Sequence, residues 1–289
     1  MPDRPVFRFA PSPNGELHIG HALSALIGYQ QARAAGGRFL LRLEDIDAAR
    51  TRPEFVAGIL EDLRWLGLDW EEPVLFQSTR MPAYRAAARQ LETMGLLYPC
   101  FATRSEIEAA ACAGDRDPDG APLYPGLWKG RPQRHIDDAL AAGRPCAWRI
   151  DMAAALRTAA VILRMRPLTF VELDAGGVPQ IVEARPERWG DAVIVRKDVA
   201  TSYHLSVVVD DAWQGVTHVT RGRDLYAATD LHRLLQVLFD LPEPVYQHHR
   251  LIVDSDGRKL SKSAHDTSLR SLRKAGVGAD EVRRRLGVG

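Results

Sequence analysis

The sequence predicts an α/β protein built around one parallel sheet, and three observations support this class. Short apolar segments alternate with helical patterns over the first hundred residues, and strand–helix alternation of this kind is typical of parallel sheets. The same alternation returns after residue 190, behind a middle segment of different character. The composition, with 46% hydrophobic and 26% charged residues in a chain of 289, is globular and excludes a disordered chain or a small disulfide-stapled or metal-stapled module.

Each element expected in the first half has a local reason. A Pro-rich turn at residues 11–15 ends the first strand because it can extend neither strand nor helix. Gly36 and Gly37 stop the first helix, whose apolar residues recur with helical period from about His18. Pro53 and Pro82 stand at helix starts. The expected elements are a strand at 6–10, a helix from 18 to 36, a strand at 38–43, and helices from 53 and from 82 to 95.

The middle of the chain predicts an inserted α+β subdomain. Residues 109–130 are rich in Gly, Pro and Asp, and residues 169–183 have the pattern of short strands around a Gly-Gly pair. Apolar segments at 192–196, 205–209 and 215–220, followed by a helix through 231–238, then resume the regular pattern. The predicted division is a first half of the sheet domain at 1–97, the insert at 98–190, the second half at 191–266 and a basic C-terminal tail at 267–289.

Charge and composition narrow the compartment and the classes of partner. The formal net charge of +1 hides a basic C-terminal end, so it does not exclude a nucleic-acid partner. No apolar run approaches the roughly 18–20 residues of a membrane span, and residues 1–8 lack the apolar core of a signal peptide. Cys100, Cys112 and Cys146 are odd in number and unevenly spaced, which suits reduced thiols. We therefore expect a cytoplasmic protein with no membrane partner.

The clearest chemical signal is the tetrapeptide His18-Ile19-Gly20-His21, where the Pro-rich loop ends and a helix begins. A helix start presents unpaired N–H groups and the positive end of the helix dipole, which favours phosphate. Gly20 permits a close approach of the backbone, and both histidines are able to donate hydrogen bonds to phosphate oxygens. A bare tetrapeptide also occurs by chance, so this assignment needs a second signal.

The second signal is the basic segment 258–263, whose sequence is RKLSKS. Lys259 and Lys262 are suited to neutralising the charge on a leaving pyrophosphate. Alone, the segment is equally compatible with a solvated charged turn. In this order along the chain, the two segments resemble the HIGH and KMSKS signatures of the class I aminoacyl-tRNA synthetases.

The resemblance extends to the glutamyl branch of that class. The segments that carry it are 8–13 (RFAPSP), 17–21 (LHIGH), 41–47 (LRLEDID), Tyr203, 220–222 (TRG) and Asp224. Full glutamyl-tRNA synthetases have a long anticodon-binding region after the lysine signature, whereas 26 residues follow Ser263 here. In this, and in residues 206–217, the chain is similar to the stand-alone glutamyl-Q tRNA(Asp) synthetase family. The resemblance implies a Rossmann-type nucleotide-binding sheet with no anticodon-binding domain.

A glutamate substrate has two carboxylates and one ammonium, so its pocket needs cations and an anion. By resemblance, Arg221, Arg8 and Tyr203 hold the side-chain carboxylate, Glu44 takes the ammonium, and Ala10 and Ser12 line the substrate. Each residue also has a structural interpretation: Arg8 as an edge charge, Glu44 as part of a solvated loop, and Arg221 as a turn arginine. Their joint occurrence at matching positions favours the functional interpretation.

The implied reaction is tRNA-independent activation of glutamate by ATP to glutamyl-adenylate, followed by transfer to queuosine of tRNA(Asp). Because the substrate supplies the nucleophile, catalysis needs alignment and stabilisation of phosphate charge. His18, Gly20, His21 and Lys262 are expected to bind ATP, with Lys259 as a further catalytic lysine and Mg²⁺ bridging the phosphates. We expect a monomer. The alternatives are a truncated discriminating glutamyl-tRNA synthetase, a small-molecule nucleotidyltransferase, and a non-catalytic tRNA-binding paralogue.

Relatives in this family often hold zinc on Cys-x-Cys followed by Tyr-x-x-x-Cys. Cys100 and Tyr124 match that pattern, but Ala102 and Trp128 do not. Zinc needs four good donors, so we predict no zinc and no other metal held by the protein. The insert is instead expected to pack around Phe101 and Trp128.

Two adjacent pairs of polar residues are open to more than one interpretation. His248 and His249 follow each other on a predicted strand and so point in opposite directions, which favours a structural or nucleotide-adjacent role over metal binding. Asp210 and Asp211 either ligate Mg²⁺ or cap a turn, and the turn is favoured.

Overall fold

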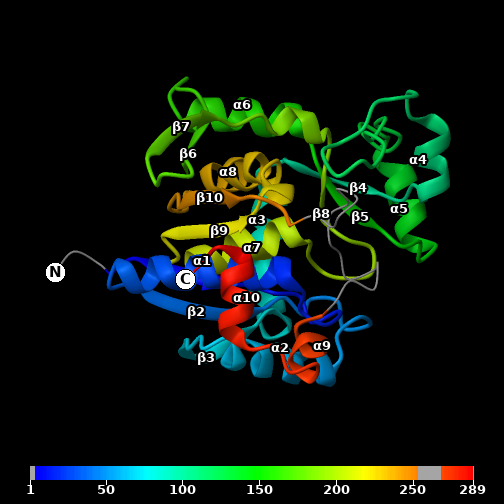
Figure 1. Cartoon of the computed structure of the whole chain (residues 1–289). Coiled ribbons are helices and arrows are strands. Elements are labelled where there is room, and N and C mark those ends of the chain that lie inside the picture. The colour runs from blue at the N-terminus through cyan, green and yellow to red at the C-terminus, as the bar shows by residue number, and fades with distance from the viewer. Residues whose placement is uncertain (1–3, 253–267, 289) are drawn as a thin grey trace.

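The computed structural model describes residues 4–252 and 268–288, which form two sheets surrounded by helices (Figure 1). The main sheet has seven strands in the order β3-β2-β1-β9-β10-β6-β7. Its neighbouring strands pair in parallel, except β6 and β7, which form an antiparallel hairpin at one edge. In sheet order the strands are β3 (Glu71–Phe76), β2 (Arg38–Leu43), β1 (Val6–Phe9), β9 (His218–Gly222), β10 (Val245–His249), β6 (Thr169–Leu173) and β7 (Pro179–Glu183).

The second sheet is small and antiparallel. It contains β4 (Leu97–Cys100), β5 (Ala147–Ile150) and β8 (Val193–Val195), in that order. Helices α4 (Arg104–Ala110) and α5 (Gln133–Ala141) lie beside it, at the right of Figure 1. A parallel Rossmann-like sheet with a small antiparallel sheet confirms the predicted fold class. The boundaries at 97, 190 and 266 stay a prediction, and β6–β7, expected in the insert, pairs with the main sheet.

Helices cover both faces of the main sheet because side chains alternate along its strands. Phe7 and Phe9 of β1 pack into a core with one group of helices, whereas Arg8 between them points to the opposite face and meets α7. The first group comprises α1 (Ile19–Ala34), α2 (Pro53–Trp65), α9 (Leu269–Lys274) and α10 (Ala279–Leu286). The opposite group comprises α3 (Met81–Thr93), α6 (Met152–Ile162), α7 (Tyr203–Trp213) and α8 (Ala228–Phe239).

The segment expected as a basic tail contributes to the first core. Leu269, Leu272, Val282 and Leu286 are buried there, in the same cluster as side chains of α1 and α2. The backbone N–H of Leu269 donates to the carbonyl of Leu17 at 2.8 Å, and Ser268 forms a β-bridge with His18. The C-terminal helices are thereby anchored beside the start of α1.

Two elements differ from what the sequence pattern indicated. Strand β3 was not expected, because it begins with two glutamates and a proline, Glu71, Glu72 and Pro73. All three are exposed at the sheet edge. The apolar segment at 205–209 lies within helix α7. There the side chain of Ser202 caps the helix by accepting from the N–H of Leu205, and the valine run is buried against α8 and α3.

No helix within 4–252 or 268–288 has both the length and the apolar character that crossing a membrane requires.

Candidate active site

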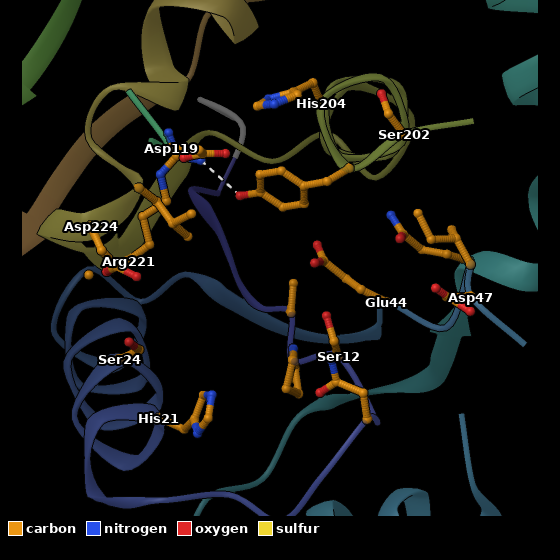
Figure 2. Close-up of a pocket in the computed structure, with 18 of the residues that line it drawn as sticks. Ser12, His21, Ser24, Glu44, Asp47, Asp119, Ser202, His204, Arg221 and Asp224 are labelled. Carbon is orange, nitrogen blue, oxygen red and sulfur yellow. Dashed lines mark hydrogen bonds between the residues drawn. The ribbon is translucent and has the colours of Figure 1, made fainter. Parts of the chain in front are cut away.

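A cavity of about 840 Å³ opens at the carboxyl ends of the parallel strands (Figure 2). The order of strands along the main sheet reverses between β1 and β9. From β1 the chain continues to β2 on one side, and from β9 it continues to β10 on the other. Ligands of open α/β sheets bind at such a switch point. The predicted site residues that the structure describes all line this one cavity: Arg8, Ala10, Ser12, His18, Gly20, His21, Glu44, Tyr203 and Arg221.

The start of α1 forms one wall of the cavity. His18 is the N-cap, and its Nδ1 accepts from the N–H of Gly20 at 3.1 Å, while Nδ1 of His21 accepts from the N–H of His18 at 3.1 Å. Because both Nδ1 atoms act as acceptors, the neutral rings carry their protons on Nε2. A Cβ at residue 20 would lie 2.9 Å from Cε1 of His18, so the ring arrangement requires glycine there.

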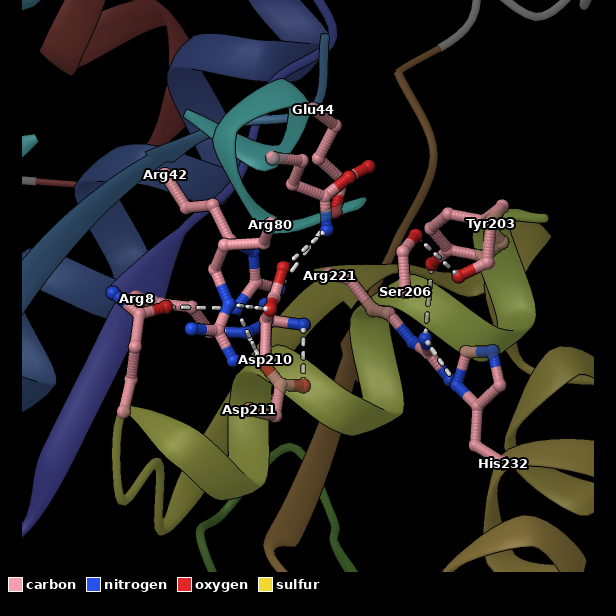
Figure 3. A network of polar contacts seen from close by, with 12 residues as sticks. Arg8, Arg42, Glu44, Arg80, Tyr203, Ser206, Asp210, Asp211, Arg221 and His232 are labelled. Atoms are coloured by element: carbon pink, nitrogen blue, oxygen red, sulfur yellow. Dashed lines mark hydrogen bonds and ion pairs between the residues drawn. The ribbon is translucent and has the colours of Figure 1, made fainter. Parts of the chain in front are cut away.

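The second wall holds a buried network of arginines and carboxylates (Figure 3). Asp211 accepts from Nε and Nη2 of Arg8 at 3.1 and 3.3 Å, and from Nη1 of Arg42 at 2.8 Å. Burial alone would raise the pKa of Asp211, but the two guanidinium groups overcome it and hold that pKa below its ordinary value. Arg8 and Arg42 are therefore already neutralised in part by the protein itself.

Glu44 follows directly after β2 and points into the cavity in Figure 2. Its Oε1 lies 3.7 Å from Nη2 of Arg42, beyond hydrogen-bond distance. Burial raises the pKa of Glu44 to about 7, although Arg42 and Arg8 act in the opposite direction. Burial therefore destabilises the charged form of Glu44. A ligand cation, such as an ammonium group, would stabilise that form by replacing the lost hydration.

Arg221, on β9, is buried among uncharged groups. Its guanidinium donates to the hydroxyl of Tyr203 at 3.2 Å (dashed line in Figure 3) and to ring nitrogens of His232 and His248. Among the described residues no carboxylate lies within ion-pair distance of it. A buried cation without a counter-ion is costly, so this part of the cavity favours an anionic ligand.

The remaining predicted residues divide into two groups. Ala10 and Ser12 line the cavity from the loop that follows β1. Lys259 and Lys262 lie outside the described residues. The chain on either side of their segment reaches the cavity region, because Ile252 lines the cavity and Ser268 pairs with His18.

Asp210 and Asp211 were misjudged from the sequence. They lie inside α7 and do not cap a turn. Asp210 is fully buried and accepts from Gln77, Arg80 and Tyr84, at 2.9, 2.6 and 2.5 Å, so its oxygens are used within the protein. Adjacent acids inside an apolar run were the signal that both needed buried cationic or donor partners.

The insert also contributes to the cavity, which the sequence did not indicate. Residues 115–123 form a short turn, which backbone hydrogen bonds between Asp117 and Ala121 and between Leu123 and Asp115 close. The turn contributes Asp117, Asp119 and Pro122 to the lining of the cavity.

The residues at the position of the family's zinc site do not suit zinc. Sγ of Cys100 donates to the hydroxyl of Tyr124 at 3.3 Å, Ala102 has no donor atom, and the ring of Trp128 packs on Phe101 at 4.7 Å between centroids. Two donors of four leave a tetrahedral ion incomplete. The absence of zinc stays a prediction.

Nearly the whole chain matches one known protein family. Residues 6–283 match the family described as tRNA synthetases class I (E and Q), catalytic domain. The chain belongs to this family. Membership implies the use of ATP and confirms the prediction of a class I aminoacyl-tRNA synthetase fold and enzyme class.

Individual relatives narrow the resemblance. The chain is 46% identical over 298 residues to the glutamyl-Q tRNA(Asp) synthetase of Rhodobacter capsulatus, covering 98% of this chain and 100% of that protein. It is 39% identical to the protein of the same name from Symbiobacterium thermophilum, covering 95% and 83%. The glutamate–tRNA ligase of Parasynechococcus marenigrum is 37% identical, and the match spans only 56% of that longer protein. The similarity to glutamyl-Q tRNA(Asp) synthetases predicted from the sequence is thus confirmed.

Solved structures agree with this placement in the family. The glutamate tRNA ligase of Elizabethkingia meningosepticum, in complex with its amino acid, aligns with a TM-score of 0.69 and 26% identity over 95% of this chain. The match spans 53% of that chain, about half of its length. A methionyl-tRNA synthetase of Mycobacterium tuberculosis, at 14% identity and a TM-score of 0.59, shares the fold alone.

Proposed function

We propose that this protein activates glutamate with ATP, without tRNA, and then transfers the glutamyl group to queuosine of tRNA(Asp). The observation that carries the glutamate assignment is the buried guanidinium of Arg221, which has no carboxylate partner among the described residues and lines the same cavity as Glu44. A dicarboxylic amino acid supplies a carboxylate for Arg221 and an ammonium group for Glu44. The similarity to glutamyl-Q tRNA(Asp) synthetases over nearly the whole chain supports the RNA assignment.

In the proposed complex, Arg221 and the hydroxyl of Tyr203 hold the side-chain carboxylate, and Glu44 binds the ammonium. Ala10 and Ser12 pass close to the substrate backbone. Arg8 takes a secondary part, because Asp211 already binds it. This assigns the strongest ligand attraction to the guanidinium that the protein leaves uncompensated.

The first step transfers an adenylyl group. An oxygen of the glutamate α-carboxylate attacks the α-phosphorus of ATP, the bond to the bridging oxygen breaks, and pyrophosphate leaves. We assign the Nε2–H groups of His18 and His21 to phosphate oxygens at the start of α1, where the helix dipole would add to the attraction. Lys262 and Lys259 are proposed to neutralise the leaving pyrophosphate. Mg²⁺ would arrive on the nucleotide phosphates, because it keeps few protein ligands in such sites.

The second step releases AMP. A hydroxyl of the queuosine ring attacks the carbonyl carbon of the mixed anhydride, and an ester of glutamate forms.

We propose that the enzyme is a cytoplasmic monomer. Light scattering of the purified protein tests the monomeric state.

Two assays test the function in sequence. Purified protein is expected to exchange labelled pyrophosphate into ATP when glutamate is present and no tRNA is added. Labelled glutamate is then expected to pass to tRNA(Asp) that carries queuosine, and not to the same tRNA lacking it. Exchange that requires tRNA, or charging of tRNA(Glu), would favour a glutamyl-tRNA synthetase, and no exchange at all would favour a non-catalytic paralogue.

A further inference from the structure

The hydrogen bonds of Arg221 determine the state of its neighbours. A guanidinium group has five N–H donors and no acceptor. Nε donates to Nε2 of His248 at 3.0 Å, and Nη2 donates to the hydroxyl of Thr229 at 2.8 Å. Nη1 uses its two donors on Tyr203 at 3.2 Å and on Nδ1 of His232 at 3.3 Å. Within the described residues, one N–H of Nη2 is left for a ligand.

These donors fix the tautomer of His248. Since Arg221 only donates, Nε2 of His248 presents a lone pair and the ring proton lies on Nδ1. That Nδ1 is 2.9 Å from Oε2 of Glu172, to which it donates. Oε1 of Glu172 also accepts from the backbone N–H of His248 at 2.9 Å. Glu172 on β6, His248 on β10 and Arg221 on β9 thus form a chain of hydrogen bonds across three neighbouring strands.

The imidazole of His248 keeps the two charges at the ends of this chain apart. Burial lowers the pKa of His248 to about 4, with Arg221 acting in the same direction and Glu172 in the opposite one, so the ring is neutral near pH 7. The carboxylate of Glu172 consequently orients Arg221 through a neutral ring. Arg8 differs, because Asp211 contacts its guanidinium directly and occupies the place of an anionic ligand.

We propose that Glu172 and His248 are positioning residues that direct Arg221 towards the side-chain carboxylate of the amino-acid substrate, and thereby set the affinity for a dicarboxylic amino acid. This inference rests on the proposed function, because glutamate is the ligand assigned to Arg221. It gives the His248-His249 pair a role, since the first histidine faces Arg221 and Glu172 while His249 lies 2.6 Å from the hydroxyl of Ser24 at the cavity.

Kinetics of glutamate-dependent pyrophosphate exchange test this hydrogen-bond relay from Glu172 through His248 to Arg221. His248→Leu removes the acceptor of Arg221 Nε, and the KM for glutamate is expected to rise about 10-fold to 100-fold, as for the loss of a hydrogen bond to a charged group. The KM for ATP and kcat are expected to stay within about twofold, because the substrate carboxylate is remote from the reacting phosphate. His248→Gln, whose carbonyl accepts from Arg221 and whose NH₂ donates to Glu172, is expected to recover most of the affinity. His218→Leu, on the same sheet but without contact to Arg221, serves as the matched control.

A second readout does not depend on activity. In the full chain labelled with ¹⁵N-histidine, the NMR spectrum is expected to show His248 as the neutral tautomer protonated on Nδ1, and Glu172→Leu is expected to weaken that preference. A wild-type protein whose exchange does not depend on glutamate would refute the proposed function and the ligand assigned here. A glutamate-dependent enzyme in which His248→Leu leaves the KM for glutamate unchanged, or in which His248 is protonated on Nε2, would refute the relay alone.

Discussion

Arg8 donates two hydrogen bonds to Asp211, from Nε at 3.1 Å and from Nη2 at 3.3 Å, so its charge is partly balanced before any ligand binds. Arg221, which lines the same cavity from the neighbouring strand β9, has no such counter-ion among the described residues. The family resemblance assigns both arginines to one substrate carboxylate, but the two guanidinium groups have different partners in the structure. Substitution at Arg221 should therefore affect ligand binding most, and substitution at Asp211 should affect stability.

Arg221→Gln is expected to raise the KM for glutamate by about two orders of magnitude, because truncating one partner of a buried charge pair costs several kcal/mol. The measurement is pyrophosphate exchange over a range of glutamate concentrations, with the KM for ATP determined in parallel. Arg223→Gln, an exposed arginine two residues away, is the control and should behave as wild type. Equal losses in the two variants would argue against a specific role for Arg221.

Asp211→Asn is expected to lower the free energy of unfolding by about 3–5 kcal/mol at pH 7, because it leaves Arg8 and Arg42 buried without their shared counter-ion. Urea titration measures this, and Asp198→Asn, at an exposed ion pair, should change stability by less than about 1 kcal/mol. The folded-state pKa of Asp211 is lowered. Its contribution is therefore present above the unfolded pKa of about 4 and is lost as the pH falls further, and the difference between Asp211→Asn and wild type should shrink there.

The described residues that the family resemblance assigns to the site line one cavity because they lie at or next to the ends of strands. Arg8 is next to the end of β1, Glu44 follows β2, and Arg221 is next to the end of β9. The carboxyl ends of parallel strands meet at one edge of a sheet. Once strand–helix alternation is recognised, residues distant in sequence are thus expected to converge.

The partners of these residues were not predictable in the same way. Asp211 is 203 residues from Arg8, and Glu172 is 76 from His248. A pair of acids or histidines in an apolar run signals that buried partners exist, but it does not identify them, because pairing depends on strand order. Strand β3 was missed for a related reason: an exposed edge strand does not need the apolar pattern of a central one.

The raised pKa of Glu44 predicts a pH dependence of glutamate binding. Because burial moves this pKa to about 7, the carboxyl group is mostly protonated below that pH and has no charge for the ammonium. The KM for glutamate should fall as the pH rises from about 6 to about 8 and then level off. Glu44→Gln should raise the KM and abolish this pH dependence. A wild-type KM that is flat over the range, or a slope that Glu44→Gln retains, would assign the titration elsewhere.

The donor set at Cys100 and Tyr124 predicts that purified protein contains far less than one equivalent of zinc, since Ala102 and Trp128 supply no ligands. Elemental analysis after expression in zinc-supplemented medium measures this directly. A chelator should leave both the pyrophosphate exchange and the unfolding midpoint unchanged. One tightly bound equivalent would show that other side chains complete a site.

Gly20→Ala tests the arrangement at the start of α1. The new Cβ would lie 2.9 Å from Cε1 of His18, so the ring must move and its hydrogen bond from the N–H of residue 20 is lost. Loss of that cap costs about 1 kcal/mol, whereas replacing glycine within a helix returns about as much, so stability should change little. The KM for ATP should nevertheless rise about tenfold, as for the loss of one hydrogen bond to a charged group. Gly28→Ala, in the same helix, places its Cβ 3.5 Å from the Phe39 ring, an ordinary contact, and should leave the KM for ATP unchanged. If Gly20→Ala binds ATP as tightly as Gly28→Ala does, the imidazole of His18 does not bind the phosphates.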